Sequence, residues 1–488
     1  MLRLPLPSRP ALAALGFAGL VLATVAAAAA VFATTVFAAV PAGAAAPPLP
    51  PADPVGWLQD YLRIDTTNPP ARGATGGEAR AAGYLARILH RHGVATTTYH
   101  TADGRASLVA RVEGKRPGEA LLLMHHLDVV PPGPDWRRPP FSGDLVAGEL
   151  WGRGALDVKS LGIAHLVAFL EVARRPEPPE RGLVFLAVAD EESGGVRGTA
   201  WLLDHHPEVF RGVAAVLGEG GTNKVVGDRL LWWGIETAQK RPLWLEATTS
   251  GRGGHASGLN PHSAAHSLIL ALARVLELPP QWRVTGAARR YFGALAPLHT
   301  GETRRRFADL DAWVGPDGPR GGMLPGQANL FLDTVQVTEI EAGERINVVA
   351  PTATARLDVR LLPETDADAF LDRLREAFGG QVEVEVLLSS PPSPASPVEH
   401  PAYRAVAEVL GAEGPVVPAL IAGFTDSRYF RERGIPAYGV SPFALEGPIL
   451  AGIHGRDERV PVDELRAGIE RMRRIVAAYA SGTAGSSR

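Results

Sequence analysis

Short apolar runs alternate with amphipathic helical patterns from residue 54 to about residue 240. Buried strands are predicted at 121–124, 183–189 and 214–217, and helices at 78–92 and 161–173. Alternation of strands and helices is typical of a mostly parallel sheet that carries helices on its faces. The pattern therefore predicts an α/β domain.

The pattern changes after residue 240. Strands are predicted at 243–249, 353–361 and 382–387, and helices at 261–276 and 366–378. The order strand, helix, strand, strand, helix, strand predicts an inserted α+β (ferredoxin-like) lid with helices on one face of an antiparallel sheet. Three of its four strands can be placed. The stretch 279–343 reads as irregular, and we expect it to be an elaboration of this lid.

A chain of 488 residues is too long for one simple core, so two domains are expected. After a Pro/Ser-rich return linker at 389–397, a helix, a strand and a helix are predicted at 401–410, 437–440 and 462–480. These elements complete the first domain. The catalytic domain is thus expected in two segments, 55–240 and 390–482, which flank a lid or dimerisation domain at 241–389 and precede a tail at 483–488.

The N-terminus has the features of an export signal. Arg3 and Arg9 precede an apolar stretch over 11–40, and an Ala-x-Ala site follows at 42–44 or 44–46. Residues 1–46 are therefore predicted to be a signal peptide, or a signal anchor, because the apolar stretch also suffices for a membrane span of roughly 20 residues. Either interpretation places the folded domains outside the cytoplasm, periplasmic, extracellular or membrane-anchored, behind a Pro/Ala linker at 47–54.

Composition narrows the choice of partners and ligands. With 49 basic and 52 acidic residues the net charge is -3, which gives no general electrostatic reason to bind nucleic acid. A small-molecule or peptide substrate is the better expectation. The chain contains no cysteine, which excludes disulfides, a cysteine nucleophile and thiolate metal ligands. A bound metal would therefore be held by nitrogen and oxygen atoms.

Acidic and imidazole side chains stand just past the ends of separate apolar runs. They are His126, Asp157, Glu191, Glu192, Glu219 and His454. In open α/β sheets the binding crevice lies outside the carboxyl ends of the strands, so we expect one shared site. Neutral imidazole and carboxylate oxygen both suit zinc, and a shared carboxylate can bridge two cations. The pattern therefore predicts a paired zinc site and a hydrolytic reaction.

Five motifs carry these residues in order, with the lid between the fourth and the fifth. They read LLLMHHLDVV at 121–130, GRGALDVKS at 152–160, VFLAVADEESGG at 184–195, AVLGEGG at 215–221 and IHGRDERV at 453–460. By these motifs the chain resembles the di-zinc metallopeptidase family of aminoacylase, glutamate carboxypeptidase, succinyl-diaminopimelate desuccinylase and carboxypeptidase S. The resemblance is nearest to the carboxypeptidase S and secreted N-acyl-amino-acid hydrolase branch. It implies a zinc-exopeptidase catalytic domain with an inserted lid.

The resemblance also implies how the metals are held. Asp157 would bridge two Zn2+ ions, with His126 and Glu219 completing one site and Glu192 and His454 the other. Three protein ligands for each ion leave room for water, as a catalytic site requires. Other divalent metals such as Co2+ or Mn2+ are alternatives to zinc.

Two further roles in the catalytic domain follow from the same resemblance. Glu191 would be the general base, which takes a proton from the attacking water and passes it to the leaving nitrogen. Asp128 would accept the second N–H of the His126 imidazole and so fix its tautomer. A cis peptide bond is implied between Asp157 and Val158.

Lid residues would meet the substrate. His255 matches a lid histidine that stabilises the oxyanion and, in dimeric members of the family, reaches into the site of the partner. Arg360 matches an arginine that binds the substrate carboxylate, although it could instead pair only with Asp358 or Glu364. Asn347 and the segment 424–428 also fit family patterns near the substrate. A homodimer through the lid is thus implied.

The expected activity is hydrolysis of the amide bond to a C-terminal amino acid. The enzyme would be a carboxypeptidase, a dipeptidase or an N-acyl-amino-acid amidohydrolase. The alternatives are a deacetylase or desuccinylase of a biosynthetic intermediate and a non-catalytic, ligand-binding ectodomain of the same fold. An additional cationic pocket would favour a dicarboxylate substrate.

Overall fold

The computed structural model describes residues 53–68, 76–227 and 229–483. The predicted signal peptide or anchor at 1–46, most of the linker at 47–54 and the tail after residue 483 lie outside the described residues. Within the described ranges, no helix has both the length and the apolar character needed to span a bilayer.

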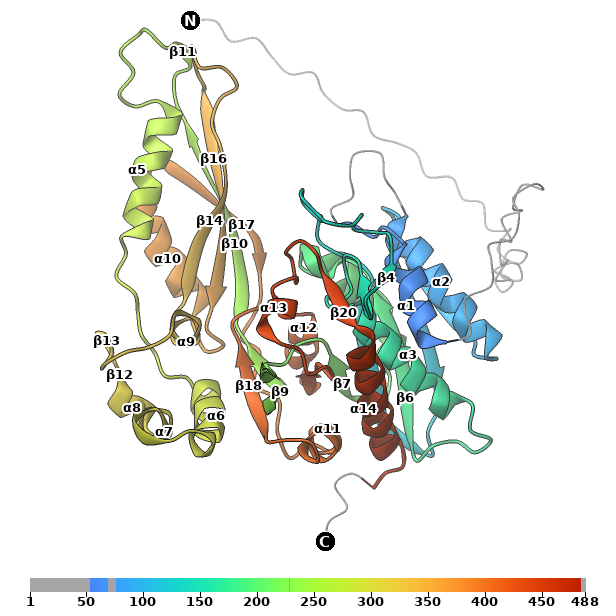
Figure 1. Cartoon of the computed structure of the whole chain (residues 1–488). Coiled ribbons are helices and arrows are strands. Elements are labelled where there is room, and N and C mark those ends of the chain that lie inside the picture. The colour runs from blue at the N-terminus through green and yellow to red at the C-terminus, as the bar shows by residue number, and fades with distance from the viewer. Residues whose placement is uncertain (1–52, 69–75, 228, 484–488) are drawn as a thin grey trace, which may run out of the picture. The chain divides into compact units, whose positions relative to one another are not determined.

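A nine-stranded, mostly parallel sheet is the centre of the first domain (Figure 1). Its strand order is β1-β2-β6-β3-β7-β19-β9-β18, and β8 pairs with β9 off this path. The strands are β1 (Thr96–His100), β2 (Ala106–Val112), β3 (Arg116–His126), β6 (Arg181–Val188), β7 (Val213–Gly218), β8 (Lys224–Val226), β9 (Arg229–Gln239), β18 (Val416–Ile421) and β19 (Ala437–Gly439). Parallel pairing joins β6, β3, β7 and β19 side by side, which aligns their carboxyl ends at one edge.

Helices cover both faces of this sheet, which explains the continuous apolar runs at 120–124 in β3 and 183–188 in β6. Leu121 and Leu123 of β3 pack into a core with the helices of one face, while Leu122 and Met124 pack into a second core on the other face. The first face carries α1 (Pro54–Leu62), α2 (Gly77–Arg91), α3 (Lys159–Ala173), α11 (Pro401–Gly411) and α14 (Val462–Ala480). The second face carries α4 (Trp201–His205), the 3-10 helix η3 (Pro207–Phe210) and α12 (Ser427–Arg431).

The lid is a four-stranded antiparallel sheet with the order β14-β16-β10-β17. Its strands are β10 (Arg241–Ser250), β14 (Thr334–Glu341), β16 (Thr352–Leu361) and β17 (Val382–Ser389), and its helices are α5 (Ala264–Leu276) and α10 (Ala367–Phe378). Alternate residues of β10 and β16 pack against these two helices in a core of their own. The predicted α/β class with an inserted ferredoxin-like lid is confirmed.

The stretch 279–343, expected to be irregular, contains several regular elements. These are α6 (Gly286–Leu295), the 3-10 helix η4 (Ala296–Leu298), α7 (Gly301–Ala308), α8 (Leu310–Trp313), β12 (Val314–Gly315), β13 (Gly318–Pro319), α9 (Pro325–Ala328) and β14, the fourth strand of the lid sheet. β14 was missed because it is a largely exposed edge strand, where polar side chains such as Gln336 and Glu339 dilute the apolar alternation.

The helices of this stretch also pack elsewhere than expected. Tyr291, Phe292 and Phe331 form an aromatic core with Val417 and Leu420 of β18. The stretch expected to elaborate the lid therefore covers the end of the large sheet. The physical reason is that β18 is an edge strand whose apolar face needs a cover.

Small sheets bring distant segments together. β4 (Asp144–Val146), β5 (Glu149–Trp151) and β20 (Arg459–Pro461) form one of them, in the order β20-β5-β4. Since β5 lies just before Asp157 and β20 just after His454, this pairing sets the two segments side by side. A second, two-stranded sheet in the lid pairs β11 (Gly254–His255) with β15 (Val348–Val349).

Candidate active site

Three parallel strands end at one edge of the central sheet and present acidic and imidazole groups there. β3 ends at His126, and Glu219 is the first residue after β7. Glu191 and Glu192 follow β6 in a single 3-10 turn, η1 (Glu191–Ser193). Because the strands are parallel neighbours, their carboxyl ends converge. The structure thus brings together four of the residues expected past the apolar runs.

Asp157 lies between the two histidines. Its Oδ1 atom is 3.0 Å from Nε2 of His126, and its Oδ2 atom is 3.0 Å from Nε2 of His454. The peptide bond between Asp157 and Val158 is cis. One carboxylate therefore presents one oxygen to each imidazole.

Each histidine also faces a second carboxylate. Nε2 of His126 lies 3.4 Å from Oε2 of Glu219, and Nε2 of His454 lies 3.2 Å from Oε2 of Glu192. Ligand atoms about 2.0–2.2 Å from a tetrahedral zinc ion lie about 3.3–3.6 Å from one another, close to these separations. Glu191 borders the first group, because donor atoms of His126, Glu191 and Glu219 all lie within 4.8 Å of one another.

The charge balance of this cluster fits divalent cations. Among the described ion pairs, Asp157, Glu192 and Glu219 have only His126 and His454 as partners. Oε1 of Glu192 is buried without a hydrogen-bond partner. Buried carboxylates are costly unless they are paired or coordinate metal. The nitrogen and oxygen donors present are those that zinc accepts.

Protons compete with cations for the donor atoms of this cluster, because several acidic and imidazole groups lie close together there. Burial raises the pKa of Glu219 to about 7, against the opposing effect of His126. Hydrogen bonds to Asp157 and Glu192 raise the pKa of His454 to about 10. Because metal ligands must be deprotonated, metal binding at this cluster should release protons and weaken as the pH falls.

Asp128 contacts His126 through a different atom from the one expected. Nδ1 of His126 faces the backbone carbonyl oxygen of Asp128 at 2.8 Å, whereas the Asp128 carboxylate is 3.6 Å away. The predicted acceptor, the carboxylate, is therefore replaced by the carbonyl of the same residue. The buried carboxylate accepts hydrogen bonds from the backbone N–H groups of Glu191 at 3.2 Å and Glu192 at 3.0 Å. Asp128 thus connects the histidine to the turn that carries both glutamates.

Glu191 is buried next to the cluster and is disposed to hold a proton. Burial raises the pKa of its carboxyl group well above the ordinary range, and the neighbouring Glu219 carboxylate raises it further. A cation bound by Glu219 would offset this second effect. A carboxylate with a raised pKa is a stronger base, which suits transfer of a proton at neutral pH.

Asn68 and Arg105 also support the turn, and the sequence motifs did not single them out. Nδ2 of Asn68 donates to Oδ2 of Asp128 at 2.7 Å, and Arg105 donates to Oδ1 of Asn68 at 2.7 Å. Arg105 also pairs with Asp190 at 3.1 Å, the residue before Glu191. No motif signal marked either residue, since both come from segments far from the cluster in the sequence.

Glu458 and Arg153 are a second missed pair, although both lie inside quoted motifs. They form a buried ion pair of 2.6 Å. The Glu458 carboxylate accepts hydrogen bonds from the backbone N–H groups of Leu156 at 2.6 Å and Asp157 at 3.0 Å. Glu458 follows His454 by four residues, so it ties the loop of one histidine to the loop of the shared aspartate. Their positions four residues from candidate ligands were the available signal.

His255 and Asn347 lie together in the lid, away from the contacts of the cluster. His255 is exposed in β11, and its Nδ1 atom is 2.8 Å from the hydroxyl of Ser257. The N–H of Ala256 donates to the carbonyl of Asn347 at 3.1 Å. Across the described ranges, no hydrogen bond or ion pair joins either residue to the cluster.

Arg360 has the partner that the sequence offered as the alternative. Its Nε and Nη2 atoms bind the two oxygens of Asp358 at 2.6 and 2.7 Å. Its guanidinium also stacks on the ring of Phe424, 4.4 Å from the centroid, and Arg428 stacks on the same ring at 4.5 Å. Phe424 therefore joins the lid to the segment 424–428.

Known proteins resemble this chain in sequence and in fold. The family model described as peptidase family M20/M25/M40 matches residues 122–478. The chain is 28% identical to N-fatty-acyl-amino acid synthase/hydrolase PM20D1 of Xenopus tropicalis, over 77% of this chain and 76% of that protein. It is 27% identical to human aminoacylase-1, over 88% and 95% of the two chains.

A solved structure repeats the architecture at lower identity. The M20 family metallo-carboxypeptidase Sso-CP2 from Sulfolobus solfataricus superposes with a TM-score of 0.65 at 20% identity, covering 88% of this chain and 99% of that one. The family match extends over most of the chain and includes every strand end that carries the cluster. The chain therefore belongs to the peptidase family M20/M25/M40.

Proposed function

We propose that this protein is a zinc-dependent hydrolase that cleaves the amide bond between an acyl group and a C-terminal amino acid. The observation that best supports this function is the position of Asp157. One of its carboxylate oxygens lies 3.0 Å from the imidazole of His126, and the other lies 3.0 Å from that of His454. A carboxylate shared in this way suits two cations that act on one substrate atom. Family membership and the relatives named as an aminoacylase and an N-fatty-acyl-amino acid synthase/hydrolase support the same reaction class.

In this proposal His126, Asp157 and Glu219 hold one zinc ion, and Asp157, Glu192 and His454 hold the second. Co2+ and Mn2+ remain alternatives, since both accept the same donors. When bound, the two ions supply Lewis acidity that polarises the substrate carbonyl and lowers the pKa of water.

Glu191 moves the proton in the proposed reaction. Its carboxylate takes a proton from the attacking water and then donates that proton to the leaving nitrogen, so that a free acid and a free amine result. Asp128 keeps this carboxylate in place, because it binds the backbone N–H groups on both sides of the turn. Burial of Glu191 keeps bulk water from competing for the proton.

The lid residues complete the site in the proposed complex. Arg360 and Asn347 bind the carboxylate of the leaving amino acid, and His255 stabilises the oxyanion. The exposure of His255 and the lack of a described contact between it and the cluster support a role in the site of a second copy, in a homodimer formed through the lid. Sedimentation of the active enzyme as a monomer at assay concentrations would remove the cross-subunit role.

Export is proposed as well, on the sequence of residues 1–46 alone. Fractionation of producing cells should recover the activity from the periplasm, the medium or the membrane, with the enzyme domain accessible to external protease. Recovery in the cytosol with an intact N-terminus would contradict export.

The test of the function is a panel of N-acyl amino acids and dipeptides, read out by release of the free amino acid. We expect turnover that is abolished by a chelator and restored by Zn2+. The matched control is the protein in which Glu191→Gln removes the base, loaded with the same two equivalents of zinc. Two bound zinc ions with no turnover on the whole panel would instead favour a ligand-binding ectodomain.

A further inference from the structure

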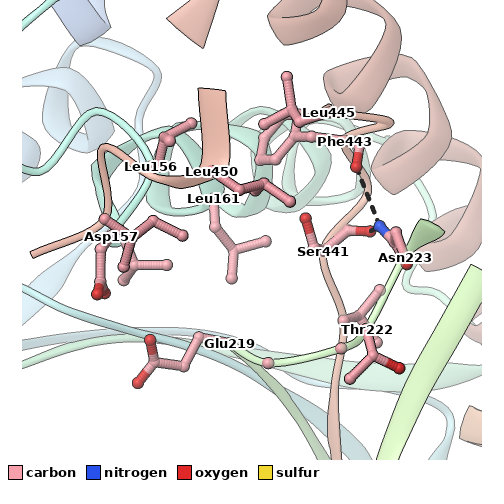
Figure 2. Close-up of a pocket in the computed structure, with 15 residues that line it drawn as sticks. Leu156, Asp157, Leu161, Glu219, Thr222, Asn223, Ser441, Phe443, Leu445 and Leu450 are labelled. Carbon is pink, nitrogen blue, oxygen red and sulfur yellow. Dashed lines mark hydrogen bonds between the residues drawn. The ribbon is translucent and has the colours of Figure 1, made fainter. Parts of the chain in front are cut away.

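A cavity of about 290 Å³ opens beside the carboxylate cluster (Figure 2). Asp157 and Glu219 line one side of it, so a group held there adjoins the proposed reaction centre. Most of the remaining wall is hydrocarbon, including Leu156, Leu161, Phe443, Leu445 and Leu450. The figure shows these side chains around a common space, with the two carboxylates at its edge. All of them come from the catalytic domain.

Two polar side chains in the wall, those of Asn223 and Thr222, already have partners within the protein. The Asn223 amide donates to the carbonyls of Ser441 at 2.8 Å and Phe443 at 3.0 Å, and its oxygen accepts the N–H of Gly234 at 3.1 Å. The hydroxyl of Thr222 lies 3.3 Å from that of Tyr291. Asn223 therefore holds the wall in place instead of recognising a polar ligand.

No arginine, lysine or histidine is among the described residues that line this cavity. A second carboxylate on the acyl group, as in a succinyl group, would find no cation there. An α-ammonium group, as in a dipeptide, would find only the two carboxylates that also serve as candidate metal ligands. The wall therefore favours an uncharged acyl group.

A separate cleft lies on the lid side of the cluster. Glu192 lines it together with the lid residues Trp244, Arg356 and Asp358, the last of which binds Arg360. The two linings share no residue. The proposed carboxylate-binding arginine thus belongs to one side of the cluster, and the apolar cavity to the other. This arrangement separates the leaving amino acid from the acyl group.

We propose that the apolar cavity binds the acyl part of the substrate and selects an unbranched hydrocarbon chain of medium length or an aryl-alkyl group. The proposal rests on the proposed function. Cavities of about 150 Å³ bind benzene, so roughly twice that volume holds a phenyl ring with its linking carbons, or a chain of comparable bulk. Short acyl groups would leave the apolar wall exposed to water.

The expected specificity follows from burial of methylene groups. Each added methylene should raise kcat/KM about fourfold until the cavity is full, because it removes apolar surface from water. The increase should therefore run from acetyl through butyryl to hexanoyl and then level off. Succinyl, which matches butyryl in length but carries a charge, should fall well below it.

The experiment measures kcat/KM of the zinc-loaded protein on a series of N-acyl-L-alanines that differ only in the acyl group. A first variant, Leu450→Trp, reduces the space in the cavity and should lower the hexanoyl-to-acetyl ratio by more than tenfold. A second, Leu450→Ala, enlarges the cavity and should move the preference to longer chains. Leu276→Trp, at an exposed position of α5 in the lid, is the matched control and should leave the ratio as it is.

Binding gives a readout that does not depend on turnover. The Glu191→Gln protein should bind N-hexanoyl-L-alanine more tightly than N-acetyl-L-alanine in calorimetry, and Leu450→Trp should remove the difference. Hydrolysis with no dependence on acyl length, or a preference for succinyl over butyryl, would overturn the cavity assignment while leaving the hydrolase intact. Tight, length-dependent binding with no turnover would overturn the hydrolase and keep the cavity.

Discussion

The two regions with candidate functional residues differ in how firmly the chain holds them. At the strand ends of the catalytic sheet, His126 is almost fully buried and contacts Asp157, Glu219 and the carbonyl of Asp128. In the lid, His255 is exposed on a two-residue strand, and among the described contacts its imidazole hydrogen-bonds only to Ser257. Groups that share a cation need fixed separations, which parallel strand ends supply. A group that meets the substrate only on closure, or in a partner copy, can stand on an exposed edge.

The largest expected effect on activity comes from a substitution in the buried cluster at the strand ends. Glu191→Gln should lower kcat by about 10²–10⁴-fold, since a neutral amide cannot take the proton. The zinc content and the circular dichroism spectrum should be those of the parent, because Gln fills the same volume and the turn remains bound by Asp128. If the variant binds two zinc ions and keeps its turnover, another residue must be the general base.

The second effect tests the exposed side. His255→Ala should lower kcat by about 10²–10³-fold if the imidazole stabilises the oxyanion, without loss of zinc. His262→Ala, at another exposed position of the lid, is the control.

Mixing two inactive proteins then shows whose site His255 serves. If the histidine acts in the partner's site, an equal mixture of the His255→Ala and Glu191→Gln proteins should regain about one quarter of the parent activity, because half of the dimers are mixed and each has one intact site. If mixed dimers form but no activity is regained, His255 acts in the site of its own subunit or has no role in the reaction.

The third effect tests how the cluster is held. Glu458→Gln should weaken zinc binding about 10–100-fold, because the buried pair with Arg153 and the bonds to the loop of Asp157 are weakened. The measurement is competition with a chelator of known affinity at fixed pH. Glu413→Gln, which removes an acid from partly exposed ion pairs with Arg471 and Arg474, serves as the control. Equal zinc affinity in both variants would show that the loop needs no such anchor.

The smallest effect concerns acid stability. Burial lowers the pKa of His165 to about 3, so the unfolded chain binds more protons than the folded one between about pH 3 and 6.5. The stability due to neutral His165 is therefore complete above pH 6.5 and is lost as the pH falls, by about 2 kcal/mol at pH 5. His165→Phe should flatten the dependence of the unfolding free energy on pH between 7 and 5. The core of the lid is aliphatic and aromatic, so its amide exchange should change less over the same range.

The sequence predicted regular elements best where they are buried. The apolar runs within β3, β6 and β7 were recognisable because both faces of the sheet are covered there, so consecutive residues of each run are apolar. The edge strand β14 and the helices over 286–313 were not recognised. The apolar residues of these helices face partners, such as Val417 of β18, that lie far away in the chain. A local sequence pattern does not show which distant segment of the chain will pack over an apolar face.

The chain order alone determined which residues could share a site, because a polar side chain just past a parallel strand must emerge at one edge of the sheet. The tertiary structure decided the contacts themselves. Whether His126 binds the carbonyl or the carboxylate of Asp128 depends on local rotations that a sequence pattern does not encode. That Glu458 holds the loop of Asp157, 301 residues away in the sequence, depends on the pairing of β5 with β20. Periodicity determines on which face of a helix or strand a side chain lies, whereas packing between these elements determines the distance between two side chains.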